Sequence, residues 1–510
     1  MNKARGFAFL LILILLNGQA AHAQQVPFLQ EFFSRAGQVY KLYNAQLKKG
    51  ANLGAFDSLR KRAEDAFRKG SIPSIIELLG EGQALLEGRP WDEKQRFLSS
   101  LTIETDRAVI EPNQELQVSL VRIYPTAPEK ALGASPTVTF EVVPEPATRE
   151  SNGPVAASPV LIARRLPVAD VATGAGRRLL LADGTYWVVA TIEVEGKKVG
   201  QAKRAVYAVG DFSNQVASFA RRIDALKRST DPKVKSVSAH ISTPEFQLHR
   251  LAALSKSLGE DEVNAIGEID RIETTLAALE KGADPFASER GELERAYTTS
   301  DGKLVPYRVY IPRSYDGKTI RPLVILLHGV LGDEKYYFSD MFDAETIRVE
   351  AERRGYILAG TNGRGRFGNT GATAQEDTFE VIKAVTGSYK IDSARIYLTG
   401  HSMGGLGTWL TAWSKPEVFA AIAPVSSGLP GQGDPLMSIL SKLKSVPVLV
   451  VAGGRDGLVP PERSKDSVAA AKKAGLEVSY LEIPEADHVT IVGASFSAVL
   501  DFFEKHSKQS

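Results

Sequence analysis

Residues 396–409 read IYLTGHSMGGLGTW, and this stretch decides how the carboxyl-terminal half of the chain folds. The apolar and β-branched residues before Gly400 predict a strand, and the sequence of residues 403–414 predicts a helix. Between them, GHSMG fits the pattern G-x-S-x-G, in which a sharp strand-to-helix turn exposes a serine hydroxyl. Such a turn strains the serine backbone, and Gly400 and Gly404 leave room where strand and helix approach closely. Ser402 is therefore the candidate nucleophile.

Apolar strands alternate with helical stretches on both sides of this turn. Six strands are predicted, at PLVILLHG, GYILAGTN, ARIYLTGH, FAAIAPVSS, VPVLVVAGG and LEVSYLEIP, after a hairpin that turns at Asp301-Gly302. Helical stretches lie between several of them, at 375–387, 403–414 and 463–474. Strands joined by helices form a mostly parallel sheet covered on both faces. We predict a doubly wound α/β domain over 286–510, which begins after the helix-breaking sequence GADP at 282–285.

A serine hydroxyl is a weak nucleophile until a base removes its proton, and histidine is the usual base. The chain has seven histidines. Four lie in the first residues, in an upstream helical region or in the polar tail, and His328 ends a predicted strand. His401 directly precedes the serine, so its side chain is expected to point away from the hydroxyl. His488, in the loop PEADHVT after the last predicted strand, is the remaining candidate base.

The base in turn needs a carboxylate that holds its tautomer. Asp456 follows the strand VPVLVVAGG, which places it at the carboxyl edge of the sheet, where open α/β sheets build their sites. Asp487 is the alternative because it adjoins His488, but neighbouring residues on a loop rarely orient each other. We favour Asp456. Its neighbour Arg455 is interpreted as a partner in a surface ion pair rather than as a substrate contact.

Four sequence blocks together resemble the α/β-hydrolase superfamily: RPLVILLHG, DSARIYLTGHSMGGLGTW followed by PEVFAAIAPVSSG, AGGRDGLVP, and ADH. The resemblance covers about 290–505 and is strongest to secreted carboxylesterases similar to polyhydroxyalkanoate depolymerases, feruloyl esterases and prolyl-oligopeptidase-like hydrolases. Serine, aspartate and histidine also follow one another in the order of that superfamily.

The resemblance implies a two-step mechanism that needs no cofactor and no metal. Ser402 would attack an ester carbonyl with His488 as base and Asp456 orienting it, and water would then release the acyl group. The oxyanion hole would consist of the backbone N–H groups of Met403 and Val330. The lipase-type HGGG loop is absent, because His328-Gly329 is followed by Val-Leu-Gly.

The chain before the α/β domain divides into three further regions. Large apolar residues at three- and four-residue steps predict short helices over 24–98 and again over 211–285, the latter ending in a linker. Between them, runs that alternate apolar and polar residues predict an immunoglobulin-like β-sandwich over 99–210. We expect the two helical regions to pack against each other, with the sandwich inserted between them.

The first residues predict a cleaved secretory signal over 1–23. Lys3 and Arg5 are followed by a short apolar run at 7–16 and by the small residues of Ala-His-Ala. The apolar run is shorter than a membrane span, although an uncleaved anchor is the alternative. We therefore expect a secreted or periplasmic bacterial protein without a stable membrane anchor.

Composition narrows the function classes. The 510 residues carry 62 Lys and Arg against 60 Asp and Glu, a net charge of +2 that offers no general attraction for nucleic acid. The chain has no cysteine, which excludes a thiol nucleophile and a thiolate zinc site. The predicted function is hydrolysis of an ester in a small molecule, a polyester or an acylated glycan. Two alternatives stay open, a prolyl-oligopeptidase-like peptidase and a glycan- or cell-surface-binding protein with a secondary hydrolase domain. Oligomeric state is not predicted.

Overall fold

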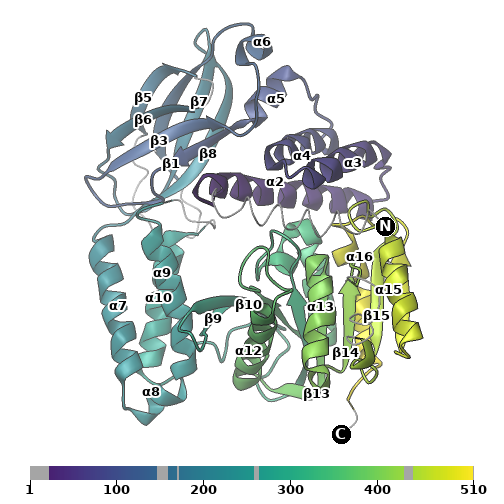
Figure 1. The fold of residues 1–510 in the computed structure, drawn as a ribbon. Coiled ribbons are helices and arrows are strands. Elements are labelled where there is room, and N and C mark those ends of the chain that lie inside the picture. The colour runs from purple at the N-terminus through teal and green to yellow at the C-terminus, as the bar shows by residue number, and fades with distance from the viewer. Residues whose placement is uncertain (1–21, 146–158, 169–171, 258–262, 430–439, 509–510) are drawn as a thin grey trace.

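The computed structural model describes residues 22–145, 159–168, 172–257, 263–429 and 440–508 (Figure 1). The predicted signal of 1–23 therefore lies outside the described residues, apart from its last two positions, with which helix α2 begins. Across these ranges no helix combines the length and the apolar character needed to cross a bilayer.

The carboxyl-terminal domain is built on one eight-stranded sheet, with the order β16-β15-β14-β13-β11-β12-β10-β9. Strands β11 to β16 are parallel to one another, and β9 and β10 add an antiparallel hairpin at one edge. The bounds are β9 (Gly291–Thr298), β10 (Leu304–Ile311), β11 (Arg321–Leu327), β12 (Ile357–Thr361), β13 (Ile391–His401), β14 (Ala421–Val425), β15 (Val448–Gly453) and β16 (Val478–Ile483). The predicted mostly parallel sheet is confirmed.

Helices cover both faces of this sheet, and the strands β12, β14 and β15 are accordingly buried at every position. One face packs against α12 (Ala372–Ser388), α13 (Met403–Ser414) and α15 (Pro461–Lys473). The other packs against α11 (Ala344–Arg354) and α16 (Ile491–Glu504). Short 3-10 helices complete the domain: η2 (Tyr336–Phe338), η3 (Asp340–Phe342) and η4 (Pro416–Val418).

Two smaller sheets enclose a separate apolar core in the middle of the chain. Their strand orders are β1-β3-β6 and β2-β8-β7-β4-β5. The elements are β1 (Leu101–Thr105), β2 (Val109–Ile110), β3 (Glu115–Arg122), α6 (Pro128–Leu132), β4 (Thr137–Pro144), β5 (Val160–Pro167), β6 (Ala172–Arg178), β7 (Gly184–Val194) and β8 (Lys197–Ala208). Alternating burial along β3 and β4 fits the period of two in the sequence. The immunoglobulin-like character stays a prediction.

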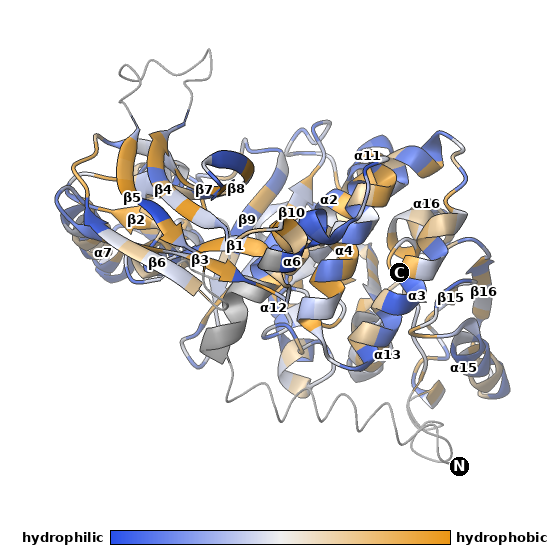
Figure 2. Ribbon diagram, turned by 90° about the horizontal axis from the view of Figure 1, so that it is seen from above, coloured by the Kyte–Doolittle hydropathy of each residue, from blue (hydrophilic) through white to orange (hydrophobic). Residues whose placement is uncertain are grey.

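Helices form two groups at separate places in the molecule (Figure 1). The first comprises α2 (His22–Lys48), α3 (Gly54–Arg68), α4 (Ile72–Leu86) and α5 (Glu93–Ser99). The second comprises α7 (Phe212–Arg228), α8 (Pro232–Ser236), η1 (Ser238–Ile241), α9 (Ser242–Ala253) and α10 (Ala265–Glu280). Hydrophilic and hydrophobic residues are interspersed along α3 and α4, as expected for amphipathic helices (Figure 2).

The expectation that the two helical groups pack against each other is wrong, because they belong to different apolar cores. Helices α2 to α4 pack with Met341 of the α/β domain and lie over the end of the sheet that carries the site. Helices α7 to α10 instead pack with Ala108 and Val209 at the base of the sandwich, and α9 contacts β9 and β10. Each group thus covers a different apolar surface.

The turn at Ser402 has the strained geometry that its sequence predicts. The serine backbone has φ 57° and ψ −115°, between the end of β13 and the start of α13. A Cβ added at Gly400 would lie 2.2 Å from the carbonyl oxygen of Gly404, and one at Gly404 would lie 2.1 Å from that of Leu327. Neither glycine therefore tolerates a side chain without movement of the backbone.

We expect Gly404→Ala to lower the free energy of unfolding by about 1–3 kcal/mol, the usual cost of overpacking. Gly387→Ala is the matched control, because this glycine also lies in a helix but has open space around its Cβ position. The control should stabilise the protein by about 0.5–1 kcal/mol, the helix preference of alanine over glycine. Urea unfolding of both variants beside the wild type measures the difference. Equal stability of the two variants would contradict the close approach at Gly404.

Candidate active site

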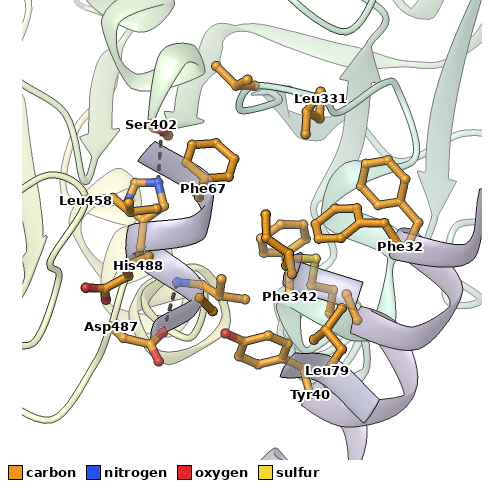
Figure 3. A pocket seen from close by; sticks show the side chains of 18 of the residues that line it. Phe32, Tyr40, Phe67, Leu79, Leu331, Phe342, Ser402, Leu458, Asp487 and His488 are labelled. Atoms are coloured by element: carbon orange, nitrogen blue, oxygen red, sulfur yellow. Dashed lines mark hydrogen bonds between the residues drawn. The ribbon is translucent and has the colours of Figure 1, made fainter. Parts of the chain in front are cut away.

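Three side chains from distant parts of the α/β domain meet at the carboxyl edge of the sheet. Ser402 follows β13, Asp456 follows β15, and His488 lies between β16 and α16. His488 Nε2 is 3.1 Å from Ser402 Oγ (Figure 3). On the other side of the ring, His488 Nδ1 is 2.8 Å from Asp456 Oδ2. With the proton on Nδ1, the imidazole donates to the carboxylate and accepts from the hydroxyl. The structure therefore brings together the three residues that the sequence singled out.

Asp456 is held rigidly in this position. Its side chain is 0% exposed, and its Oδ1 accepts hydrogen bonds from the backbone N–H groups of Leu458 at 3.0 Å and Val459 at 2.8 Å. These bonds stabilise the ionised carboxylate in a buried place and leave Oδ2 for the histidine.

Asp487 has a different role from the alternative considered for it. Its Oδ1 accepts from the backbone N–H groups of Val489 and Thr490 at 2.9 and 2.8 Å, and from the Thr490 hydroxyl at 2.9 Å. The carboxylate thus organises the turn that leads into α16.

The environment of His488 favours its protonated form. Burial by itself lowers the pKa of this imidazole, but the charge and hydrogen bond of Asp456, with the charges of Asp487 and Glu64, raise the pKa above its ordinary value. The site therefore stabilises an imidazolium, the form that a general base reaches once it has taken a proton.

His401 lies beside His488 and lines the same pocket as Ser402. Side chains alternate along a strand, so His401 lies on the same face of β13 as Tyr397 and Thr399, the face covered by α11 and α16. His488 lies just before α16 and reaches this face too. The two imidazole centroids are 4.6 Å apart, and Tyr336 Oη lies 2.7 Å from His401 Nδ1. Burial, together with the nearby His488, lowers the pKa of His401 well below its ordinary value. His401 is thus a neutral neighbour of His488.

The two backbone N–H groups expected at the oxyanion hole, those of Met403 and Val330, are both unengaged. Met403 is the first residue of α13, where N–H groups have no partner within the helix. Val330 lines the same pocket as Ser402, and the next residue, Leu331, turns the loop with φ 68°. Among the described residues, neither N–H makes a hydrogen bond. Both can therefore donate a hydrogen bond to an anionic oxygen.

A pocket of about 130 Å³ opens beside the serine, and half of its wall comes from the N-terminal helices. Figure 3 shows Phe32, Phe67 and Phe342 around the space next to Ser402 and His488. Most of the other lining residues are also apolar, and Arg60, Glu64 and Asp487 are the charged members. The helical spacing of the aromatic residues signalled an amphipathic helix, but nothing in the sequence showed which surface it covers. No group of three or more His, Cys, Asp or Glu side chains placed to hold a metal occurs in the described ranges.

Parts of the chain are similar to known hydrolases. The model of the prolyl oligopeptidase family matches residues 343–428. Feruloyl esterase B of Talaromyces funiculosus is 28% identical over 155 residues, 27% of this chain and 42% of that protein. The uncharacterized peptidase YuxL of Bacillus subtilis is 23% identical over 334 residues, 55% of this chain and 48% of that protein.

A putative carboxymethylenebutenolidase of Methylorubrum extorquens is 32% identical over 122 residues, 23% of this chain and 41% of that protein. The chain spans less than half the length of each of these curated relatives. Among solved structures, a thermostable esterase aligns with 80% of this chain and 100% of its own, at 16% identity and a TM-score of 0.36. The sheet order and the family match show that the carboxyl-terminal domain belongs to the α/β-hydrolase superfamily.

Proposed function

We propose that this protein is a secreted serine hydrolase that cleaves carboxylic esters through an acyl-enzyme on Ser402. The observation that carries the proposal is the pair of hydrogen bonds through which His488 joins the Ser402 hydroxyl to the Asp456 carboxylate. Secretion rests on the basic, apolar and small-residue pattern of 1–23.

The reaction follows from this geometry in two steps. His488 Nε2 takes the proton of Ser402 Oγ as the oxygen attacks the ester carbonyl, and the imidazolium that forms is stabilised by Asp456. The N–H groups of Met403 and Val330 stabilise the negative oxygen of the tetrahedral intermediate, worth about 3 kcal/mol for each donor. The imidazolium then returns its proton to the departing alcohol. Water activated by His488 releases the acid and restores Ser402.

The pocket supports an ester with an apolar group on one side of the scissile bond. Aromatic and aliphatic side chains form most of its wall, and burial of apolar substrate surface contributes about 0.8 kcal/mol for each CH₂ group. Two curated relatives are named feruloyl esterases, and a third is named a bifunctional acetylxylan esterase/xylanase, so acylated plant-wall compounds are sensible first substrates.

A peptidase of the prolyl-oligopeptidase type is the second candidate. The family match over 343–428 and the similarity to the Bacillus subtilis peptidase support it, and the same three residues would serve peptide cleavage. Peptidases of that type carry a propeller whose repeats would be visible in the sequence. The 510 residues of this chain show no such repeats, which favours the esterase. In the described part of the chain, helices and two small sheets precede the α/β domain.

We expect the wild type to hydrolyse p-nitrophenyl esters with rates that rise from acetyl to larger apolar acyl groups, and to leave proline-containing peptides intact. Ser402→Ala should lose at least roughly 10⁴-fold in kcat, because no nucleophile remains. Assays of both proteins on one ester and peptide panel measure this, with intact-mass detection of the acyl-enzyme as a second readout. Peptide cleavage without ester cleavage would support the second candidate, and undiminished ester cleavage by Ser402→Ala would exclude this site.

Asp456 and Asp487 should differ sharply when each is converted to its amide. Asp456→Asn is expected to lower kcat by roughly 10³–10⁴-fold, because an amide no longer fixes the tautomer of His488. Asp487→Asn should cost less than about tenfold, since an amide oxygen can still accept the N–H groups of Val489 and Thr490. Steady-state kinetics of the pair decide the assignment. Equal losses would refute it.

The pH profile should report the raised pKa of His488. The base acts only when neutral, so kcat/KM should rise with pH with a midpoint above 6.5, the ordinary value of this group. In Asp456→Asn the residual activity should show a midpoint at lower pH, because the carboxylate that favours the imidazolium is gone. Profiles of kcat/KM between pH 5 and 9 provide the test. A wild-type midpoint below that of the variant would contradict it.

A further inference from the structure

Helix α3 is hydrogen-bonded to the loop that carries Asp456. Arg60 Nη1 donates a hydrogen bond to the carbonyl oxygen of Arg455 at 2.7 Å, and Arg68 Nη2 donates to the carbonyl oxygen of Gly457. These carbonyls belong to the residues directly before and after Asp456. Hydrogen bonds from a guanidinium are stronger than those between neutral groups.

The opposite side of the same loop is fixed by the α/β domain. The N–H of Gly454 donates to Ile483 O at 2.9 Å, and that of Arg455 donates to Ala486 O at 2.9 Å. The N–H groups of Gly454 and Arg455 therefore donate to the α/β domain, whereas the carbonyl oxygens of Arg455 and Gly457 accept from α3. Among the described residues, the carbonyl oxygens of Arg455 and Gly457 have no hydrogen-bond partner other than these two arginines.

Packing on α3 reinforces the two hydrogen bonds. Gly457 lies directly against Glu64, since a Cβ at this glycine would be 1.9 Å from Glu64 Oε2. Arg60 pairs with Glu64, and the two side chains are only 11% and 10% exposed. The Arg455 guanidinium lies 3.5 Å from Asp57 on α3 and also pairs with Glu485, the ion-pair role expected from the sequence.

We propose that Arg60 and Arg68 are positioning residues, which hold the loop 455–457 so that the Asp456 carboxylate meets His488. The N-terminal helices thereby complete the active site as well as form part of its wall. This inference rests on the proposed serine hydrolysis and assigns α3 a part in it.

Arg68→Met is the decisive variant, because this side chain is 46% exposed and its removal leaves the cores intact. We expect kcat to fall roughly ten- to a hundredfold, the scale of an error of about 1 Å in placement, with KM little changed. Arg68→Lys should restore most of the loss, since an ammonium also donates to a carbonyl. Arg60→Met and Arg60→Lys repeat the comparison on the other carbonyl.

Two controls separate positioning from simple docking of the helices. Arg62→Met removes an arginine of the same helix that pairs with Glu81 of α4. Lys41→Met combined with Lys48→Met removes two ion pairs that join α2 to Asp340 and Asp343 of the α/β domain. Both controls should keep wild-type kcat and the wild-type pH profile.

The pH profile of Arg68→Met gives a readout that a structural role would not move. The charged or titratable groups around His488 are Asp456, Asp487 and His401 from the α/β domain, and Tyr40, Arg60 and Glu64 from the N-terminal helices. Loss of a positive charge from α3 would by itself favour the imidazolium and move the acid limb of kcat/KM to higher pH. Displacement of Asp456 removes the main stabiliser of the imidazolium, so we expect a shift to lower pH.

The inference is overturned if Arg68→Met matches the Lys41/Lys48 control in kcat and in the pH of the acid limb. It is also overturned if the acid limb moves to higher pH, since that result means a charge effect. Failure of the proposed function looks different, because ester hydrolysis by the wild type would then survive Ser402→Ala.

Discussion

The contact between the His488 imidazole and the Asp456 carboxylate is the interaction on which the active site depends. It joins two loops that leave neighbouring parallel strands, β15 and β16, and it requires a buried charge. A buried carboxylate is stable only when hydrogen bonds replace its water. The N–H groups of Leu458 and Val459 supply those bonds, and the imidazole supplies the third. The parallel sheet fixes where these groups meet, since its carboxyl edge gathers the ends of distant strands.

The N-terminal helices give this edge a second layer. They place apolar rings opposite the serine, and α3 contributes two arginines that bind the carbonyls around Asp456. The chain has no cysteine, so these regions are joined by burial and polar contacts alone. A similar polar joint links α9 to the sheet, where Arg250 donates to the buried Glu294 of β9 at 2.6 and 2.7 Å. Burial by itself would raise the pKa of Glu294, but Arg250, together with the charges of Arg308 and Lys335, lowers that pKa below its ordinary value.

Much of the α/β domain could be predicted because its signals are local. Continuous apolar runs marked the strands, and the glycines around Ser402 marked the strained turn. Asp456 was preferred to Asp487 because the end of a strand fixes where a side chain lies, and the structure places it beside His488. The position of His401 beside His488 could not be predicted, because the sequence does not show that the turn before α16 brings His488 to the same face of the sheet. The packing of the helical groups was misjudged because amphipathic helices reveal an apolar face but not its partner.

The sequence by itself determined the nucleophile turn, the strand-rich α/β pattern and the order of serine, aspartate and histidine. Each depends on residues that are close along the chain or on the rule that parallel strands end at one edge. Only the tertiary structure decided which residues form the wall of the pocket and which arginines of α3 bind the loop 455–457. Arg60 and the carbonyl it binds are 395 residues apart, and Arg68 and its carbonyl are 389 apart. Contacts over such separations arise from the packing of whole domains, which leaves no periodic trace in either segment.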